Sequence, residues 1–281
     1  MATSSSKTGS PGSPGDRFNP HAAHPARVYN YWLGGKDHYE ADRAAGEAVE
    51  AIRPQIVASA RANRHFLARS VRWLADHGVR QFLDVGTGLP APDNTHEVAQ
   101  SAASSSRVVY VDNDALVLAH ARALLTSSAD GSCDCVDADL REAGMILREA
   151  GRTLDFSQPV ALLLLAVLHL IPDSDDPAGM VGALAAGLAP GSYIVISHMT
   201  ADFAPGPVAA AAAAYNEHAP VPVTARTRGQ VTALFGGIPL IPPGVVSITG
   251  WRPELGDPLT PVADLYAGVG RTDRPWEGWL A

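Results

Sequence analysis

The chain of 281 residues has little cysteine, no run rich in lysine and arginine, and no apolar stretch long enough to cross a bilayer. Its two cysteines, Cys133 and Cys135, are too few for a disulfide framework or a zinc site, so we expect reduced thiols and a cytoplasmic protein. A net charge of -8 without a basic run argues against binding nucleic acid through its phosphates. The longest apolar run, residues 160–168, is about half of what a membrane-spanning helix needs, so we expect no membrane partner.

The N-terminus also lacks an apolar segment, because residues 1–18 are rich in serine, glycine and proline. This composition excludes a signal peptide or anchor and predicts a disordered tail. The hydrophobic content of 46% and the charged content of 18% are ordinary for a globular protein. We expect a single domain over residues 19–281, with a helical cap at 19–60 and a core at 61–281.

Five apolar runs alternate with helical segments between residues 81 and 197, and each run predicts a strand. These strands are expected at Gln81–Asp84, Arg107–Asp114, Cys133–Leu140, Val160–Leu168 and Ser192–Ser197. The alternation predicts an α/β fold with a doubly wound parallel sheet and helices on both faces. Two later segments, Leu240–Ile241 and Val245–Trp251, flank a Pro-Pro-Gly turn and suggest an antiparallel hairpin at one edge.

The stretch Phe82–Pro90 is the most informative one, because an apolar run ends in Asp84 and then in Gly86-Thr87-Gly88. This pattern predicts a buried strand followed by a tight turn whose backbone can approach a ligand closely. Two neighbouring strands also end in acids, at Asp112 and Asp139. The carboxyl ends of parallel strands meet at one edge, so the three acids predict a site, and Asp112 suits the two hydroxyls of a ribose.

Two classes of nucleotide cofactor fit such a turn. Gly86–Ala91 satisfies the G-x-G-x-x-A pattern of dinucleotide-binding folds, which would make the chain an NAD(P)-dependent oxidoreductase. However, Pro90 and Pro92 remove two N–H donors that would hold a pyrophosphate, and Asp84 would repel it. The charge pattern therefore favours S-adenosylmethionine, which carries an ammonium and a sulfonium and has no phosphate.

Asp84-Val85-Gly86-Thr87-Gly88 resembles the first motif of the class I S-adenosylmethionine-dependent methyltransferases. The chain as a whole resembles the actinobacterial S-adenosyl methyltransferase family long carried as a domain of unknown function. That resemblance lies in residues 27–37, 84–94, 109–114, the segment around His169, 243–246 and 251–253. It implies a Rossmann-like sheet of seven strands with the last antiparallel, a helical N-terminal extension and S-adenosylmethionine as cofactor. It does not imply a substrate.

The resemblance also implies which residues contact the methionine part of the cofactor. Gly86 and Gly88, with Thr87 between them, would flank this part. Asp84 would face its ammonium, and Ala166 would line the floor beside the sulfonium.

On the nucleoside side, the resemblance implies that Asp112 holds the ribose and that Asn113 lies beside the adenine. Asp139 would accept from the adenine amino group, and Leu140 would pack on the ring. Arg64, on the helix predicted at residues 55–77, is a further candidate to point into the pocket.

An aromatic segment at residues 27–38 contains Tyr31 and is broken by Gly34-Gly35. It either covers the cofactor as a lid, with Tyr31 in contact, or packs on the core as a strap. A general base is needed only if the acceptor arrives protonated, and His169 at the end of the fourth strand is the first candidate, followed by His198, Tyr29 and Tyr31.

Three functions remain open from the sequence: a methyltransferase acting on a small molecule, an oxidoreductase, and a non-catalytic regulatory protein that binds S-adenosylmethionine. The scattered histidines form no metal-binding pattern, so no metal is expected. The oligomeric state is not fixed by any motif.

Overall fold

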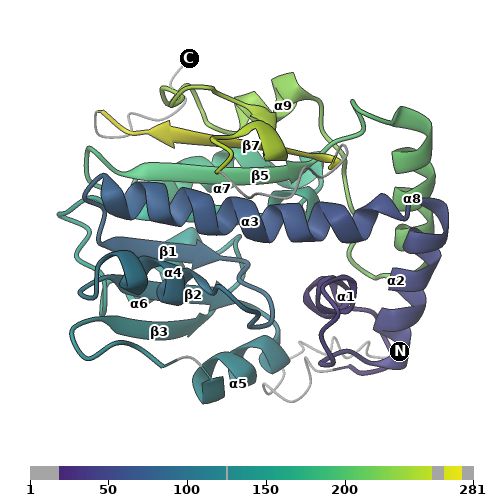
Figure 1. Ribbon diagram of the computed structural model, residues 1–281, viewed down its shortest axis with the longest axis horizontal. Helices are drawn as coiled ribbons and strands as arrows, with labels where there is room; N and C mark the ends of the chain where they lie inside the picture. Colours follow the sequence, from purple (N-terminus) through teal and green to yellow (C-terminus); the bar gives the residue numbers. More distant parts are fainter. Residues whose placement is uncertain (1–18, 125, 255–262, 274–281) are drawn as a thin grey trace, which may run out of the picture.

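A seven-stranded sheet forms the centre of the computed structural model, which describes residues 19–124, 126–254 and 263–273 (Figure 1). The predicted tail at residues 1–18 lies outside these ranges. The strands are β1 (Gln81–Val85), β2 (Arg107–Asp112), β3 (Ser132–Asp137), β4 (Ala161–Leu165), β5 (Tyr193–Met199), β6 (Val246–Ser247) and β7 (Leu265–Arg271). Their order is β3-β2-β1-β4-β5-β7-β6. The first five strands are parallel, whereas β7 pairs antiparallel with both β5 and β6, which confirms the predicted seven strands with the last antiparallel.

Both faces of the sheet are covered, because the central strands are apolar on both sides. In β1, Phe82 joins the core under α3 (Gln55–Asp76) and α4 (Thr95–Ala102), whereas Leu83 joins the opposite core. That second core is closed by α6 (Ala143–Ala150), α7 (Pro177–Ala185) and α9 (Arg228–Ala233). The remaining core helix, α5 (Ala115–Leu124), lies beside the edge strand β3 (Figure 1).

The hairpin predicted between Leu240–Ile241 and Val245–Trp251 is wrong. Leu240 instead forms a bridge with Gly270, and Val246–Ser247 pairs with Tyr266 and Ala267, so both segments contact β7. The sequence analysis missed β7 because its two glycines weaken a strand pattern. Packing requires those glycines, since a Cβ atom on Gly268 or Gly270 would lie 3.1 Å from the ring of Phe235.

A helical cap lies at one end of the sheet (Figure 1) and is built from distant parts of the chain. It combines α1 (Pro25–Trp32) and α2 (Glu40–Ile52) with α8 (Pro205–His218) around a small apolar core of their own. The boundary expected at residue 60 falls inside α3, which runs unbroken from beside the cap along the sheet. The sequence analysis placed α8 outside the cap.

The buried carboxylate of Asp42 fixes the starts of both N-terminal cap helices. It is fully buried and accepts hydrogen bonds from the backbone N–H groups of His24 and Tyr39, each at 2.8 Å. The guanidinium of Arg27, on α1, lies 3.4 Å away. One side chain of α2 therefore holds α1 in place.

We expect the substitution Asp42→Ala to lower the free energy of unfolding by about 3 kcal/mol, because it leaves buried donors and a buried cation without their partner. Urea denaturation would measure the change. The matched control is Glu47→Ala, an exposed position on the same helix, which should change stability by less than about 0.5 kcal/mol. Equal effects of the two substitutions would contradict this role of Asp42.

Candidate functional site

A cavity of about 350 Å³ lies between the carboxyl ends of the parallel strands and the helical cap. It is lined by eleven of the twelve residues formed by the predicted cofactor contacts and the first candidate base. They are Arg64, Asp84, Gly86, Thr87, Gly88, Asp112, Asn113, Asp139, Leu140, Ala166 and His169. The strands thus bring together residues that are far apart in the chain, as their shared edge predicts.

The glycine turn after β1 adopts a backbone that only glycine tolerates easily. Gly86 and Gly88 have φ angles of 75° and 68°. The N–H of Gly86 donates to the carbonyl oxygen of Val111 at 2.8 Å, which closes the turn against β2. A Cβ atom on Gly86 would lie 2.4 Å from Cγ2 of Val167, whereas one on Gly88 would have space. Gly86 is therefore required by both its conformation and its packing.

Asp112 is held rigidly beside this turn. Its two oxygens accept from the backbone N–H groups of Gly88 and Asp114, at 2.9 and 3.0 Å. Burial raises the pKa of Asp112, and these hydrogen bonds oppose the shift. Asp114 in turn lies 2.9 Å from Nδ1 of His24, at the start of the cap. Each carboxylate oxygen can accept a further hydrogen bond, so Asp112 keeps the capacity to bind a diol.

Asp84 is nearly buried at the end of β1. It accepts a hydrogen bond of 2.6 Å from the hydroxyl of Thr95. Burial raises the pKa of Asp84 to about 6, although that hydrogen bond and the charge of Arg64 lower it. Arg64 donates to the carbonyl oxygens of Pro92 and Asp93 at 3.0 and 2.8 Å, so it anchors the loop that follows the turn.

Asp139 lies in a more open position than the other two acids. Its side chain accepts from Nδ2 of Asn113 at 2.8 Å and lies 3.2 Å from Nη1 of Arg141. Leu140 is buried next to it in the cavity wall. This side of the cavity therefore combines two fixed carboxylates near the turn, a third at the rim and an apolar surface beside it.

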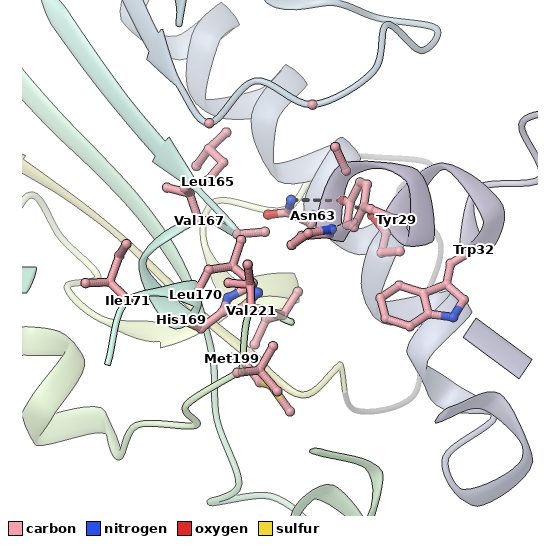
Figure 2. A pocket seen from close by; sticks show the side chains of 18 of the residues that line it. Tyr29, Trp32, Asn63, Leu165, Val167, His169, Leu170, Ile171, Met199 and Val221 are labelled. Carbon is pink, nitrogen blue, oxygen red and sulfur yellow. Dashed lines mark hydrogen bonds between the residues drawn. The ribbon is translucent and has the colours of Figure 1, made fainter. Parts of the chain in front are cut away.

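The segment after β4 forms the floor of the cavity. Ala166 has a φ of 53°, and its N–H donates to the carbonyl oxygen and the hydroxyl of Ser197 at 3.1 and 2.9 Å. His169 follows in a short 3₁₀ turn, and Figure 2 shows it close to Leu170 and Val221. Burial and the nearby charge of Arg226 lower the pKa of His169 to about 4, so its imidazole is neutral at neutral pH. Its enclosed Nδ1 atom makes no hydrogen bond to the described residues.

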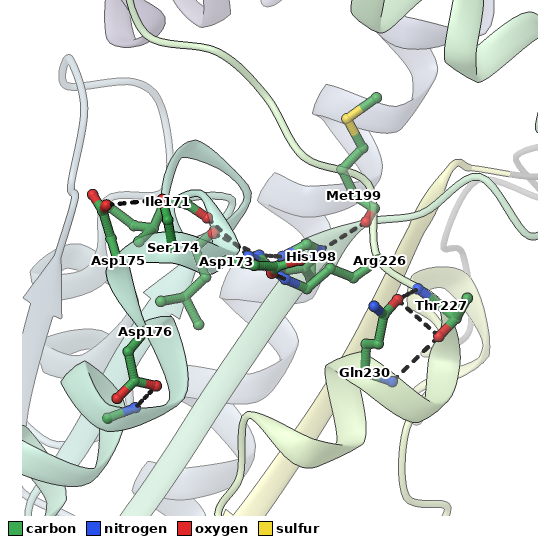
Figure 3. A network of polar contacts seen from close by, with 12 residues as sticks. Ile171, Asp173, Ser174, Asp175, Asp176, His198, Met199, Arg226, Thr227 and Gln230 are labelled. Atoms are coloured by element: carbon green, nitrogen blue, oxygen red, sulfur yellow. Dashed lines mark hydrogen bonds and ion pairs between the residues drawn. The ribbon is translucent and has the colours of Figure 1, made fainter.

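His198, the second candidate for a general base, belongs to a buried polar network behind the cavity wall and does not itself line the cavity (Figure 3). Nη1 of Arg226 donates to its Nε2 at 2.8 Å, so its Nδ1 donates to the carbonyl oxygen of Met199 at 2.7 Å. Arg226 also pairs with Asp173 at 2.6 Å. Burial lowers the pKa of His198 to about 3. Both ring nitrogens are occupied, so of these two candidate bases only His169 faces the cavity.

The aromatic segment contributes Tyr29 and Trp32 to the cavity, and Tyr31 lies elsewhere. The ring of Tyr31 packs where a Cβ atom on Gly46 would be and meets His38 edge-on, with ring centroids 5.3 Å apart. Residues three apart share a helix face, so Tyr29 and Trp32 face the cavity when Tyr31 faces α2. The alternatives of lid and strap thus both describe α1, which packs on α2 and covers the cavity.

A chain of hydrogen bonds that the sequence analysis missed connects this cap to the floor. Nδ2 of Asn63 donates to the hydroxyl of Tyr29 at 3.0 Å (Figure 2), and that hydroxyl donates to the carbonyl oxygen of Ala60 at 2.9 Å. On its other side, Oδ1 of Asn63 accepts from the hydroxyl of Ser197 at 2.6 Å. Ser197 also holds Ala166. No sequence signal marks a single asparagine on a helix as such a link.

The half of the cavity away from the glycine turn has mostly apolar walls. They include Trp32, Ile56, Leu165, Met199, Val208, Ala211, Val221 and Leu265. An ion pair stands in this part of the lining, where Nε and Nη2 of Arg53 lie 2.8 and 3.0 Å from the two oxygens of Asp264. These walls were not predicted from the sequence, because the cap, α3 and the strand ends contribute them from distant parts of the chain.

The described residues offer no alternative in the form of a metal centre, since they contain no group of three or more His, Cys, Asp or Glu side chains placed to hold an ion. The two cysteines are free, and burial raises the pKa of Cys133 to about 12. Within the same part of the chain, no helix has the length and apolar character needed to cross a membrane.

Comparisons with known proteins agree with this geometry. The family model described as S-adenosyl methyltransferase matches residues 12–273. A DUF574 family protein from Streptomyces avermitilis superposes with a TM-score of 0.85 at 41% identity, covering 89% of this chain and 98% of that one. A protein named as a candidate methyltransferase from Thermobifida fusca gives a TM-score of 0.82 at 39% identity, with coverage of 90% and 96%.

More distant comparisons inform the fold alone. Human N-acetylserotonin methyltransferase, solved in complex with S-adenosylmethionine, gives a TM-score of 0.50 at 14% identity, covering 93% of this chain and 66% of that one. Among curated proteins, no match to the chain was found. The matched family model spans most of the chain. The chain therefore belongs to the S-adenosyl methyltransferase family and is a class I, S-adenosylmethionine-dependent methyltransferase.

Proposed function

We propose that this methyltransferase transfers the methyl group of S-adenosylmethionine to an oxygen atom of a small, largely apolar acceptor. The observation that carries the proposal is the division of one cavity into two kinds of wall. One side offers the glycine turn and three carboxylates, and the other is apolar and enclosed by the cap. Its volume of about 350 Å³ is in the range of small-molecule sites, whereas a macromolecular acceptor would need an open groove.

The polar side fits the cofactor in shape and charge. The turn at Gly86 and Gly88 lets the backbone approach the methionine part, and Asp84 would face its ammonium. Asp112 would bind the ribose, and Asp139 would accept from the adenine amino group. Acidic side chains at these positions suit a cationic cofactor.

Asn113 and Leu140 would complete the adenine site, and Ala166 would lie beside the sulfonium. Thr87 and Arg64 line the same side of the cavity. Arg64 would act mainly by anchoring the loop at Pro92 and Asp93, since its Nη2 already donates there.

His169 would accept the proton of an acceptor hydroxyl. When bound, the cofactor supplies an electrophilic methyl group. A hydroxyl oxygen becomes strongly acidic as it forms its bond to carbon, so a neutral imidazole with a lowered pKa is basic enough to take the proton. The apolar walls and the cap would exclude water, which would otherwise compete as an acceptor.

The comparisons give no support for an oxidoreductase. The G-x-G-x-x-A motif matches in sequence only, because the structure after the turn differs from that of a dinucleotide site. Helix α4 begins only at Thr95, beyond Pro90 and Pro92. The glycines therefore do not lead directly into a helix N-terminus that would hold a pyrophosphate.

We expect Gly86→Ala to weaken S-adenosylmethionine binding by more than about tenfold, because alanine is strained at positive φ and its Cβ would collide with Val167. Isothermal titration calorimetry would measure the affinity. Gly144→Ala, on α6 with open space around it, is the control and should bind normally. Normal binding by both variants would contradict the assigned role of the turn.

The affinity for S-adenosylmethionine should rise with pH through the pKa of Asp84, which is about 6 in the free protein. A cationic ligand binds the charged carboxylate better, so binding one pH unit below this pKa should be about tenfold weaker than at neutral pH. Without ligand, the stability that Asp84 contributes is largest below its ordinary pKa of 3.8 and is lost as the pH rises through about 6. Calorimetry across this pH range tests the expectation, and Asp84→Asn should flatten the profile. A profile unchanged by that substitution would refute it.

His169→Ala should reduce turnover by about 10²–10⁴-fold and leave cofactor affinity unchanged, as expected when a proton acceptor is removed. Turnover would be measured as the S-adenosylhomocysteine formed from S-adenosylmethionine in the presence of each member of a panel of hydroxylated bicyclic aromatics. His218→Ala, at an exposed site on α8, serves as the control. Full turnover in His169→Ala would exclude the base, and cofactor binding without turnover of any panel member by the wild type would favour a regulatory role.

A further inference from the structure

The ion pair of Arg53 and Asp264 stands in the cavity wall at the junction of cap and core. Arg53 follows the last turn of α2, and Asp264 directly precedes β7. Their side chains retain only 15% and 6% of their exposure, and both line the cavity. An ion pair that has lost most of its water is weak evidence for stability, since apolar residues of similar size often serve as well. Its position calls for another explanation.

Asp264 is fixed so that it holds Arg53 in one orientation. Its N–H donates to the hydroxyl of Ser59 at 3.1 Å, and its carbonyl oxygen accepts from the N–H of Thr200 at 3.0 Å. Both carboxylate oxygens then accept from Arg53, at 2.8 and 3.0 Å. A planar guanidinium held at two points has little freedom left, so its remaining N–H groups are preorganised.

The nitrogen of Arg53 that Asp264 does not contact is Nη1, because Nε and one of the two N–H groups of Nη2 donate to Asp264. Nη1 has no partner among the described residues. The pair as a whole is neutral, so a carboxylate approaching it would meet the charge of Asp264 as well as that of Arg53. A neutral oxygen that accepts a hydrogen bond, such as a carbonyl, suits this donor best.

We propose that Arg53, oriented by Asp264, binds a carbonyl oxygen of the acceptor, which is an apolar ring compound carrying both a hydroxyl and a ketone. The inference rests on the proposed function and deepens it. The hydroxyl would meet His169, the carbonyl would meet Arg53, and the ring system would lie against apolar walls such as Ile56 and Leu265. Polar anchors in an apolar cavity set the orientation of a small molecule.

The test compares two matched sets of probes. Hydroxytetralones carry a phenol hydroxyl and a ketone on one fused ring system, and tetrahydronaphthols carry a methylene in place of the ketone. Their dissociation constants would be measured by calorimetry with S-adenosylhomocysteine bound. We expect at least one hydroxytetralone to bind wild-type protein about tenfold more tightly than its matched tetrahydronaphthol, as a hydrogen bond from a charged donor provides.

The decisive variant is Arg53→Met/Asp264→Leu, which removes both charges together and avoids leaving one of them buried alone. It should abolish the preference for the ketone and keep the affinity for S-adenosylhomocysteine. Arg148→Met is the control, because Arg148 is exposed and pairs only with Glu149 at the surface. This control should retain the full preference.

Three results would overturn the inference. The double variant could keep the ketone preference, or the wild-type protein could bind S-adenosylhomocysteine but no hydroxytetralone. The double variant could also lose affinity equally for both sets, which would mean that the pair only joins the cap to the core. A wild-type protein that binds neither S-adenosylmethionine nor S-adenosylhomocysteine would instead refute the proposed function, and this inference with it.

Discussion

The hydrogen bonds of Asn63 connect the two parts of the molecule that must meet to form the cavity. Its side chain is buried on α3, between the hydroxyl of Ser197 on β5 and that of Tyr29 on α1. Ser197 also fixes the backbone of Ala166, from which the segment leading to His169 departs. The side-chain amide of Asn63 therefore fixes the position of α1 relative to the floor of the cavity. A change in either would disturb the other, which couples enclosure of the acceptor to the geometry of the site.

The charges that line this cavity suit the cationic cofactor proposed to bind there. Asp84 and Asp112 are nearly buried at the ends of adjacent strands, and burial raises the pKa of each. Two carboxylates in such surroundings destabilise one another when both are charged. A nearby cation would offset this repulsion, which favours its binding. In the proposed cofactor site, these charges would disfavour a phosphate, and the glycine turn would allow the close approach of the backbone.

The grouping of the strand-end residues at one cavity could be predicted from the sequence, because it depends on local patterns. A parallel sheet forces the ends of its strands to one edge, so Asp84, Asp112 and Asp139 had to lie near one another once the strands were recognised. The choice of Tyr31 over Tyr29 depended on where α1 begins, because a shift of one or two residues turns a helix face away. Strand β7 was missed since Phe235 packs on its glycines, a contact that no local pattern reveals.

The acceptor side resists prediction for the opposite reason. Arg53 and Asp264 are separated by 211 positions, and the apolar walls come from α1, α3, α8 and the ends of β4, β5 and β7. No spacing rule connects such residues, because only the complete fold brings them together. It follows that local motifs identify the family and the cofactor, whereas the choice of acceptor is determined by non-local packing. If Arg53 binds the acceptor as proposed, a substitution there could change the acceptor without changing the residues at the strand ends.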